Sequence, residues 1–409
     1  MSKVLYLSYD GMSDPLGQSQ VLPYLRGLRR LGHQIHLVSF EKARKLEPVR
    51  AALTAEMKAD DIVWHPLSYT KTPPVISAVW DVLRLRAQVK RLQREVGFDL
   101  VHCRSYLPSL VGLQLKRDSG VRFLFDMRGF WADEKVEAGT WNLRNPLYRL
   151  VYGFFKAREA EFVAEADGIV SLTEAGRREI ERWEAYKRGR QRIAVIPCAA
   201  DFGVFTIGGA DVRDRARTEL AIPADCCVAA YLGSLGTWYM LGEMLDWYAV
   251  MRRRHPRSRF LVVTHDNPDP VRREAAARGI DPTEVIVVSS SRDRIPFYLS
   301  AADVGLFFIR PSYSKQSSSP TKLGEYFAMG IPVVTNAGVG DVDGTVESLG
   351  GGVIVSDFST DEYARSIEHL ARMAALDPQA LRERSRTIFD LQSGIAAYHR
   401  LYQSVLTDN

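Results

Sequence analysis

Residues 317–335 read SSSPTKLGEYFAMGIPVVT and join the start of a helix to a buried strand. Ser319 is a favourable N-cap, and Pro320 suits the first helical position because no backbone N–H is needed there. Gly330 and Pro332 end the helical pattern. The stretch therefore predicts a helix over about residues 320–329, followed by a strand at 332–335.

The first turn of this helix has the chemistry of an anion site. The backbone N–H groups of Thr321 and Lys322 have no acceptor inside the helix, and the positive end of the helix dipole lies behind them. Glu325 follows on the same face, where a carboxylate accepts hydrogen bonds from the two hydroxyls of a ribose. A solvent-exposed ion pair between Lys322 and Glu325 is the structural alternative.

The composition predicts a folded cytoplasmic protein of two domains. The chain has 409 residues, with 46% hydrophobic and 25% charged residues and a formal net charge of +5. So small a charge argues against a nucleic-acid partner. The four cysteines form no C-x-x-C pair, which favours a reducing compartment. The sequence predicts neither a signal peptide nor a membrane-spanning run of roughly 18 apolar residues.

Strand-like apolar runs alternate with helical patterns along the chain, as in α/β proteins with doubly wound parallel sheets. We predict two Rossmann-like domains, 1–205 and 206–387, joined through 206–216. A C-terminal helix, about 388–409, carries an apolar stripe that would pack back on the first domain. The predicted strands of the first domain are 3–9, 34–40, 99–103, 122–127, 168–173 and 193–198. Those of the second domain are one at the start of 228–238 and then 260–265, 285–290, 303–309, 332–335 and 352–355.

Open parallel sheets bind ligands beyond the carboxyl ends of their strands, so two of them predict a cleft between the domains. Gly17 stands just before the first helix, without a G-x-G-x-x-G pattern. Gly233 and Gly236 follow the first strand of the second domain, where a Cβ would obstruct a phosphate. A tight turn that needs positive φ is the alternative for both glycines.

Five motifs together resemble a known family. YLGSLGTW (231–238), IPFYLSAADVGL (295–306) and SPTKLGEYFAMGIPVV (319–334) lie in the second half, and SLTEAG (171–176) and VIPCAAD (195–201) in the first. In combination they resemble the retaining nucleotide-sugar glycosyltransferases of the GT-B fold, glycosyltransferase family four (glycosyl transferases group 1). The resemblance covers nearly the whole chain.

The resemblance implies roles for the donor-side residues. The family carries two glutamates eight positions apart on this helix, and Glu325 matches the second, which binds the donor ribose. Ser317 stands at the first, so a hydroxyl or backbone N–H from 317–319, including Ser319, is expected to replace the usual sugar contact. The remaining donor-binding residues are expected to be Lys322 and Thr321 on the phosphates, with Gly17, Gly233 and Gly236.

In the first domain, Asp126 and Arg128 end a strand and are expected to point into the cleft as catalytic residues. Relatives often have a histidine at the position aligned with Asp126. Arg128 would bind a phosphate or an acidic acceptor, and an internal Asp–Arg pair is the alternative. His102 is expected to be a hydrogen-bonded core residue. Further acceptor-side candidates are Asp14, Arg104, Trp131, Glu134 and Glu174; Trp131, Trp238 and Tyr239 would stack on a sugar or base, or only pack.

Two basic amphipathic stretches, 82–96 and 144–158, predict peripheral contact with the inner face of a membrane, with ordinary solvated helix faces as the alternative. The eight histidines are scattered, and neither a metal site nor a cofactor is predicted.

The sequence thus predicts a retaining hexosyltransferase. Its donor would be a UDP- or GDP-sugar, and its acceptor a glycan or a lipid-linked precursor of a cell-envelope polysaccharide. A nucleotide-sugar epimerase and a sugar-nucleotide-binding protein whose catalysis has decayed are the alternatives; Ser317 and Asp126 motivate the second.

Overall fold

The computed structural model describes residues 2–187, 189 and 191–407, and the chain divides into two compact units. Unit 1 comprises Met1–Pro197 and Leu391–Asn409, and unit 2 comprises Cys198–Asp390. The expected connection at 206–216 instead contains the start of a helix of unit 2, α10 (Ala210–Glu219). The last two residues of the predicted C-terminal helix, 408–409, lie outside the described residues.

Unit 1 contains a parallel sheet of seven strands in the order β3-β2-β1-β4-β5-β6-β7. The strand order reverses between β1 and β4, and the carboxyl ends of such strands are where these sheets bind ligands. The strands are β1 (Lys3–Ser8), β2 (Gln34–Glu41), β3 (Ile62–Ser68), β4 (Leu100–Arg104), β5 (Arg122–Asp126), β6 (Gly168–Ser171) and β7 (Arg192–Val195).

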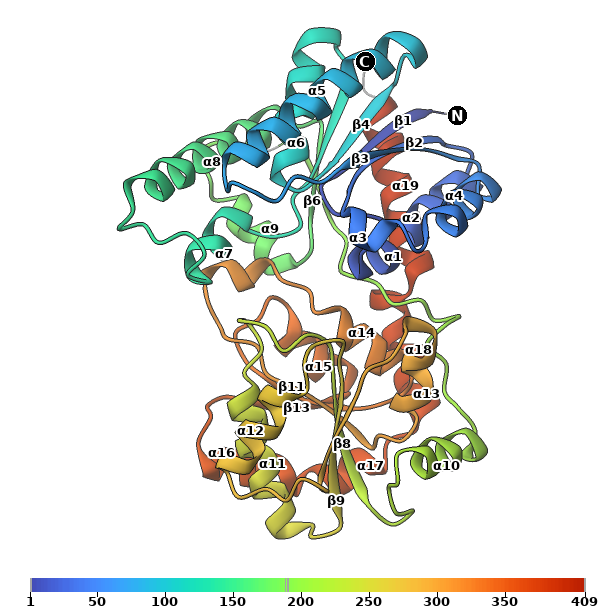
Figure 1. Ribbon diagram of the computed structural model, residues 1–409, viewed down its shortest axis with the longest axis vertical. Helices are drawn as coiled ribbons and strands as arrows, with labels where there is room; N and C mark the ends of the chain where they lie inside the picture. Colours follow the sequence, from blue (N-terminus) through green and yellow to red (C-terminus); the bar gives the residue numbers. More distant parts are fainter. Residues whose placement is uncertain (1, 188, 190, 408–409) are drawn as a thin grey trace. The chain divides into compact units, whose positions relative to one another are not determined.

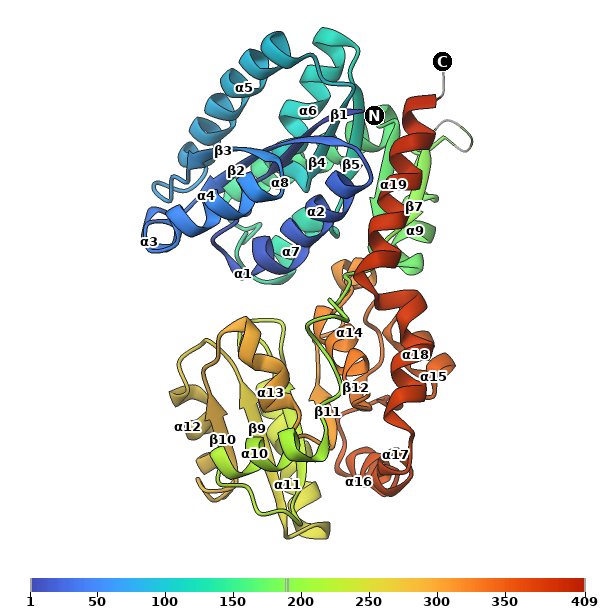
Figure 2. The same cartoon turned by 90° about the vertical axis from the view of Figure 1, so that its right-hand side faces the viewer.

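Helices cover both faces of this sheet (Figures 1 and 2). On one face, α6 packs on β4 and β5 and contacts both α5 and α8. On the other, α2 packs on β2 and β3, and α19 packs against α2 and β7. The helices are α1 (Pro15–Gln20), α2 (Leu22–Arg30), α3 (Ala43–Leu46), α4 (Arg50–Ala59), α5 (Ile76–Val96), α6 (Tyr106–Ser119), α7 (Trp131–Glu137), α8 (Pro146–Glu165), α9 (Glu174–Ile180) and α19 (Leu391–Thr407).

Unit 2 contains a parallel sheet of six strands, ordered β10-β9-β8-β11-β12-β13, which reverses between β8 and β11. Its strands are β8 (Cys227–Leu232), β9 (Ser258–Val263), β10 (Val285–Val288), β11 (Val304–Phe307), β12 (Val333–Asn336) and β13 (Gly352–Val355). Its helices, besides α10, are α11 (Leu241–Arg254), α12 (Asp269–Ala277), α13 (Ile295–Leu299), α14 (Thr321–Ala328), α15 (Val342–Leu349), α16 (Thr360–Glu368), α17 (Leu370–Ala374) and α18 (Pro378–Phe389), with 3-10 turns η1 (Arg292–Arg294) and η2 (Tyr313–Ser317).

The helix predicted at 320–329 is α14, and glycines let it pack unusually closely on its neighbours. A Cβ on Gly305 of β11 would lie 2.9 Å from the ring of Tyr326, and a Cβ on Gly324 would lie 3.1 Å from the side chain of Phe389. Gly330 ends the helix with a φ of +68°. These approaches fix α14 against β11 and α18.

The C-terminal helix α19 belongs to unit 1 and buries its apolar stripe there. The buried residues include Ile395, Leu401, Tyr402 and Val405. His399 Nδ1 lies 2.8 Å from Nε2 of His33. The other ring nitrogen of His33, Nδ1, lies 2.6 Å from Ser2 Oγ. Where the chain returns toward unit 1, the amide of Ala200 donates to the carbonyl of Phe389 at 2.8 Å. The last helix is thus an integral part of the first unit.

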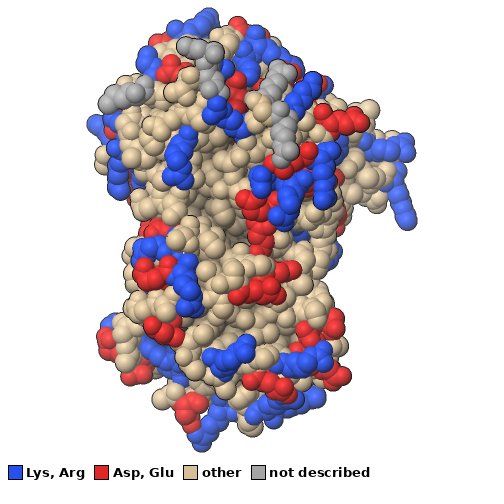
Figure 3. Space-filling model, turned by 180° about the vertical axis from the view of Figure 1, so that it is seen from behind, with Lys and Arg blue, Asp and Glu red and all other residues tan. Residues whose placement is uncertain are grey.

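The face of the molecule drawn in Figure 3 carries Lys and Arg interspersed with Asp and Glu. Among the described residues, none of the helices is long and apolar enough to span a bilayer.

Candidate functional site

The start of α14 lies where the sheet of unit 2 reverses, beside the carboxyl end of β8. Lys322 stands in the first turn, and its residue is only 5% exposed. Its Nζ donates to the hydroxyl of Tyr231 at 3.1 Å and lies 3.6 Å from the ring centroid of Tyr239. The first turn thus holds a buried cation under two aromatic rings. Stacking of Tyr239 on a sugar or base stays a prediction.

Burial holds the pKa of Lys322 well below its ordinary value, and the charge of Glu325 opposes this effect. The lysine is therefore poised to gain from a negatively charged ligand.

Gly233 gives this lysine its space. Its φ is +125°, and a Cβ there would lie 3.0 Å from Nζ of Lys322. The positive φ of this glycine is therefore confirmed, and the close approach of a phosphate to it stays a prediction. A Cβ on Gly236 would meet no described atom within 4 Å, so the protein itself gives no steric reason for that glycine.

Glu325 is also buried, at 6% exposed, so the solvent-exposed Lys–Glu pair is the wrong alternative. The carboxylate accepts from Arg292 of η1, with Nη1 3.4 Å from Oε1. Burial raises the pKa of Glu325, against the opposing charges of Arg292 and Lys322. The guanidinium of Arg292 also lies 5.5 Å from the ring centroid of Phe205. Arg292 was not predicted as a site residue. The sequence feature that could have identified it is its position in the loop after β10, at the same edge of the sheet.

The serines before α14 have partners within the protein, and their contact with a donor sugar stays a prediction. Ser319 is not the N-cap: Pro320 holds that position, and no described side chain caps the helix. The Oγ of Ser319 instead accepts from the amide of Cys198 at 3.1 Å, which ties the helix start to the chain entering unit 2. Ser317 lies in η2 and donates to the carbonyl of Ser314 at 2.9 Å. Thr321 is the first residue of α14.

In unit 1, Asp126 ends β5 as a completely buried carboxylate. Its Oδ2 accepts from the hydroxyl of Tyr398 at 3.0 Å and lies 3.2 Å from Nε2 of His102. His102 contacts the hydroxyl of Tyr402 through Nδ1 at 2.7 Å, so it is the core residue that was expected. The other oxygen of Asp126, Oδ1, has no hydrogen-bond partner among the described residues.

Two arginines act on this carboxylate. Burial would raise the pKa of Asp126, but the charge of Arg128, the contact with His102 and the charge of Arg104 hold it below its ordinary value. Arg104 is buried and donates through Nε to Asp10 at 3.2 Å. The charge of Arg128 thus acts on Asp126, in line with the alternative of an internal Asp–Arg pair, and α19 supplies a hydrogen bond that the sequence did not predict.

The Gly17 loop is built by tight turns. Gly17 lies inside α1 and not before it, and a Cβ there would come within 2.2 Å of the carbonyl of Gly11. Asp14 accepts from Lys42 at 2.9 Å and from Lys45 at 2.6 Å. Burial opposes these two lysines, yet they keep the pKa of Asp14 below its ordinary value. Both residues therefore have a structural role in this loop.

The remaining acceptor-side candidates lie in helix starts. Trp131 packs edge-on against Trp141, with centroids 5.1 Å apart, in an aromatic cluster. Glu134 is in the first turn of α7, and Glu174 pairs with Arg177 at 2.6 Å. In unit 2, the ring of Trp238 lies under Lys315 Nζ at 3.8 Å. Each ring or carboxylate has an internal contact, and its contact with an acceptor stays a prediction.

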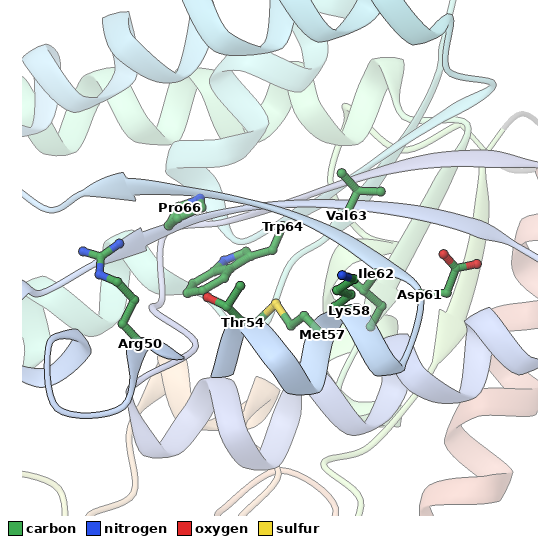
Figure 4. A pocket seen from close by; sticks show the side chains of 9 residues that line it. All are labelled: Arg50, Thr54, Met57, Lys58, Asp61, Ile62, Val63, Trp64 and Pro66. Atoms are coloured by element: carbon green, nitrogen blue, oxygen red, sulfur yellow. The ribbon is translucent and has the colours of Figure 1, made fainter. Parts of the chain in front are cut away.

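Among the described residues, no group of three or more His, Cys, Asp or Glu side chains is arranged to hold a metal ion. A cavity of about 430 Å³ lies between α4 and the edge strand β3, lined by Trp64, Met57 and Lys58 among others (Figure 4). It holds none of the predicted site residues.

Two family models match the chain. The model described as Glycosyltransferase Family 4 matches residues 18–203, and the model described as Glycosyl transferases group 1 matches residues 228–373. A D-inositol 3-phosphate glycosyltransferase of Acidothermus cellulolyticus is 27% identical over 316 residues, which span 75% of this chain and 65% of that protein. The enzyme of the same name from Corynebacterium aurimucosum is 24% identical, over 68% of this chain and 64% of that protein. The chain thus spans slightly less than two thirds of these relatives.

Solved structures share the fold. A glycosyltransferase from Rickettsia africae superposes with a TM-score of 0.73 at 15% identity, over 100% of this chain and 99% of that one. Anabaena HepE in complex with UDP-glucose superposes with a TM-score of 0.72 at 14% identity, over 99% of each chain. The two parallel sheets have the GT-B architecture, and the family models match both halves of the sequence. This chain therefore belongs to glycosyltransferase family 4, the glycosyl transferases group 1.

Proposed function

We propose that this protein transfers a hexosyl group from a UDP- or GDP-sugar to a hydroxyl acceptor, with retention of configuration and without a metal ion. The observation that carries the proposal is the pair of buried ionisable side chains on α14, Lys322 and Glu325. A buried lysine at the free N–H groups of a helix start suits a diphosphate, and a buried carboxylate one turn further on suits a ribose. Anabaena HepE, which shares the fold, was solved with UDP-glucose.

In this mechanism, the bond between the sugar C1 and the donor phosphate oxygen breaks, and C1 forms a bond to the acceptor oxygen on the same face. The acceptor proton moves to the departing phosphate oxygen. Lys322 and the amides of the first turn of α14 stabilise the negative charge on the leaving diphosphate. Glu325 holds the ribose once it exchanges its contact with Arg292 for the two hydroxyls. In unit 1, the buried carboxylate of Asp126 orients Arg128, which binds an anionic group of the acceptor.

The acceptor in this proposal is a lipid-linked or cell-envelope glycan precursor, and the protein works at the inner face of the membrane. The test has two steps. Thermal stabilisation by a panel of sugar nucleotides identifies the donor, and nucleotide release with lipid extracts then measures transfer. NMR of the first-formed product reports its anomeric configuration; an inverted product would refute retention.

Glu325→Ala tests the donor site directly. We expect at least about tenfold weaker donor binding, because two charge-assisted hydrogen bonds to the ribose are lost. Unchanged affinity would remove Glu325 from the site. Arg292→Ala is the matched control, since it frees the same carboxylate and should leave donor affinity equal or improved.

A sugar-nucleotide-binding protein without transfer is the second candidate. The observation in its favour is Ser317, whose hydroxyl is bonded to Ser314 and stands where a donor-sugar contact is expected. It predicts donor binding with no nucleotide release for any acceptor mixture.

A further inference from the structure

Exposed apolar side chains gather on two helices of unit 1. Of the thirteen large apolar residues that are exposed in the described part of the chain, seven belong to α5 and α8, so they are not scattered singly over the surface. We call them the apolar stripes. They are Ile76, Val79, Trp80 and Leu83 on α5, and Leu147, Leu150 and Phe154 on α8.

The stripes are held rigidly on folded helices. Their spacing of three and four residues places each stripe along one helical face. The opposite face of α5 is buried at Asp81, whose carboxylate accepts from the hydroxyl of Tyr9 at 2.9 Å and the amide of Thr70 at 3.1 Å. The opposite face of α8 is buried at Phe155 and Phe162. The apolar side chains therefore face solvent because the fold presents them there.

The exposed apolar surface of α5 lies earlier in the helix than the basic amphipathic stretch predicted at 82–96. The apolar residues Leu85, Val89 and Leu92 of that stretch are buried against the core, so they cannot contact a membrane. The exposed apolar face lies one to two turns earlier, at 76–83, with Trp80 56% exposed and Ile76 67% exposed. The basic residues that follow are on the outside of the same helix.

The charge around the stripes is positive. On α5, four basic residues are exposed, Arg86, Lys90, Arg91 and Arg94, and the carboxylate of Asp81 is fully buried. Lys90 pairs with Asp118 at 2.9 Å and Arg91 with Glu95 at 3.9 Å, so the four cations exceed their two acidic partners. The start of α8 adds exposed Arg144 and Arg149. A helix face with Trp, Leu and Phe flanked by Arg and Lys suits the interface of an anionic bilayer.

Both stripes lie near the functional edge of their own sheet. α5 follows the carboxyl end of β3, the sheet edge at which Asp126 lies; α8 comes after β5 and α7, and it packs against α7. The stripes occupy the first half of each helix, and α6 packs between the two helices (Figure 1). A surface at this edge would present a lipid-linked molecule to unit 1.

We propose that the apolar stripes of α5 and α8 dock unit 1 on an anionic phospholipid bilayer. Trp80, Leu83, Leu150 and Phe154 enter the headgroup region, and the arginines and lysines beside them contact lipid phosphates. The proposal rests on the membrane-facing part of the proposed function and names the surface that would meet the bilayer. Its test uses neither donor nor acceptor, so its failure is distinguishable from a failure of the transfer reaction.

The test is co-sedimentation with vesicles of phosphatidylcholine and with vesicles that also contain phosphatidylglycerol. We expect binding to the anionic vesicles, reduced by high salt. Trp80→Ser with Leu83→Ser, and Leu150→Ser with Phe154→Ser, should each weaken binding about tenfold. Leu31→Ser with Val63→Ser is the matched control, because these residues are 48% and 44% exposed outside the stripes, and it should leave binding unchanged.

A second measurement locates the contact. Three of the four native cysteines are buried, so a Leu150→Cys variant can take an environment-sensitive fluorophore at the surface. Its emission should shift to the blue with anionic vesicles. Absence of vesicle binding, or equal loss in the control and the stripe variants, would overturn the proposal. Dimerisation that the stripe variants abolish would overturn it as well, because the stripes would then bury against a second copy.

Discussion

Replacing Lys322 by methionine separates the effect of this buried lysine on stability from its effect on donor binding. The ammonium donates one hydrogen bond to the hydroxyl of Tyr231, at 3.1 Å, and lies near three aromatic rings, of which Tyr239 is the nearest at 3.6 Å. These contribute about 2 kcal/mol each for a charged donor and for a desolvated cation over a ring. Removing an ammonium from water costs several kcal/mol, so the contacts roughly offset the burial. We therefore expect the free energy of unfolding of the empty Lys322→Met protein to be unchanged, or higher by about 1–2 kcal/mol.

Donor binding should respond in the opposite direction. A contact between a buried ammonium and a phosphate is worth about 3 kcal/mol, so the variant should bind the sugar nucleotide about 100-fold more weakly. Because the pKa of Lys322 is lowered by burial, binding to the wild type should also take up a proton at pH values above that pKa. Calorimetry in buffers of different ionisation enthalpy measures both quantities.

The control is Arg257→Met, which removes the same charge from unit 2 at a side chain that is 78% exposed. It should change neither donor affinity nor proton uptake. Equal affinity of wild type and Lys322→Met would refute the assignment of the phosphate to this lysine. A loss of several kcal/mol in stability would refute the account of its burial.

Three further predictions concern stability. Gly233→Ala should cost about 1–3 kcal/mol, because of its positive φ and the nearby ammonium, while Gly236→Ala should be near neutral; chemical denaturation compares them. Tyr398→Phe should cost about 1 kcal/mol by removing a buried hydrogen bond, visible as a lower Tm and faster exchange of α19 amides. Burial, together with the charge of His399, lowers the pKa of His33 to about 4. The unfolded chain then binds a proton that the folded protein does not, so the free energy of unfolding should fall by about 2 kcal/mol as the pH drops from 6.5 toward 4. His33→Asn should flatten this pH dependence, and an unchanged slope would contradict the prediction.

The α/β class was predictable because strands buried on both faces are continuous apolar runs, as in residues 228–232 and 304–307. The edge strand β3, IVWHPLS, was missed because its burial alternates and it contains Pro66, which suits only an edge. The connection was placed at 206–216 because the strand pattern loosens after Asp201, although Arg213 within it and the following Arg217 anchor α10 through Asp303.

In the site, sequence spacing brought Lys322 and Glu325 together because helical periodicity is local. Their surroundings include Tyr231 of strand β8 and Arg292 of turn η1, and no local pattern encodes those contacts. Ser319 has the residue type of an N-cap, but its hydroxyl serves the distant Cys198 amide. The bond from Tyr398 to Asp126 joins residues 272 positions apart, beyond any periodicity.

Because α19 returns to unit 1, it affects the order in which the two units can finish folding during synthesis on the ribosome. The strands of unit 2 are complete once residue 355 has emerged. Unit 1 begins first, yet its buried Asp126 and His102 lack their tyrosine partners until residues 398 and 402 are made. Unit 2 ends at Asp390, before these tyrosines are made, so the unit that begins first is finished last. Nascent chains truncated before residue 398 should therefore expose an unfinished first unit to chaperones and proteases.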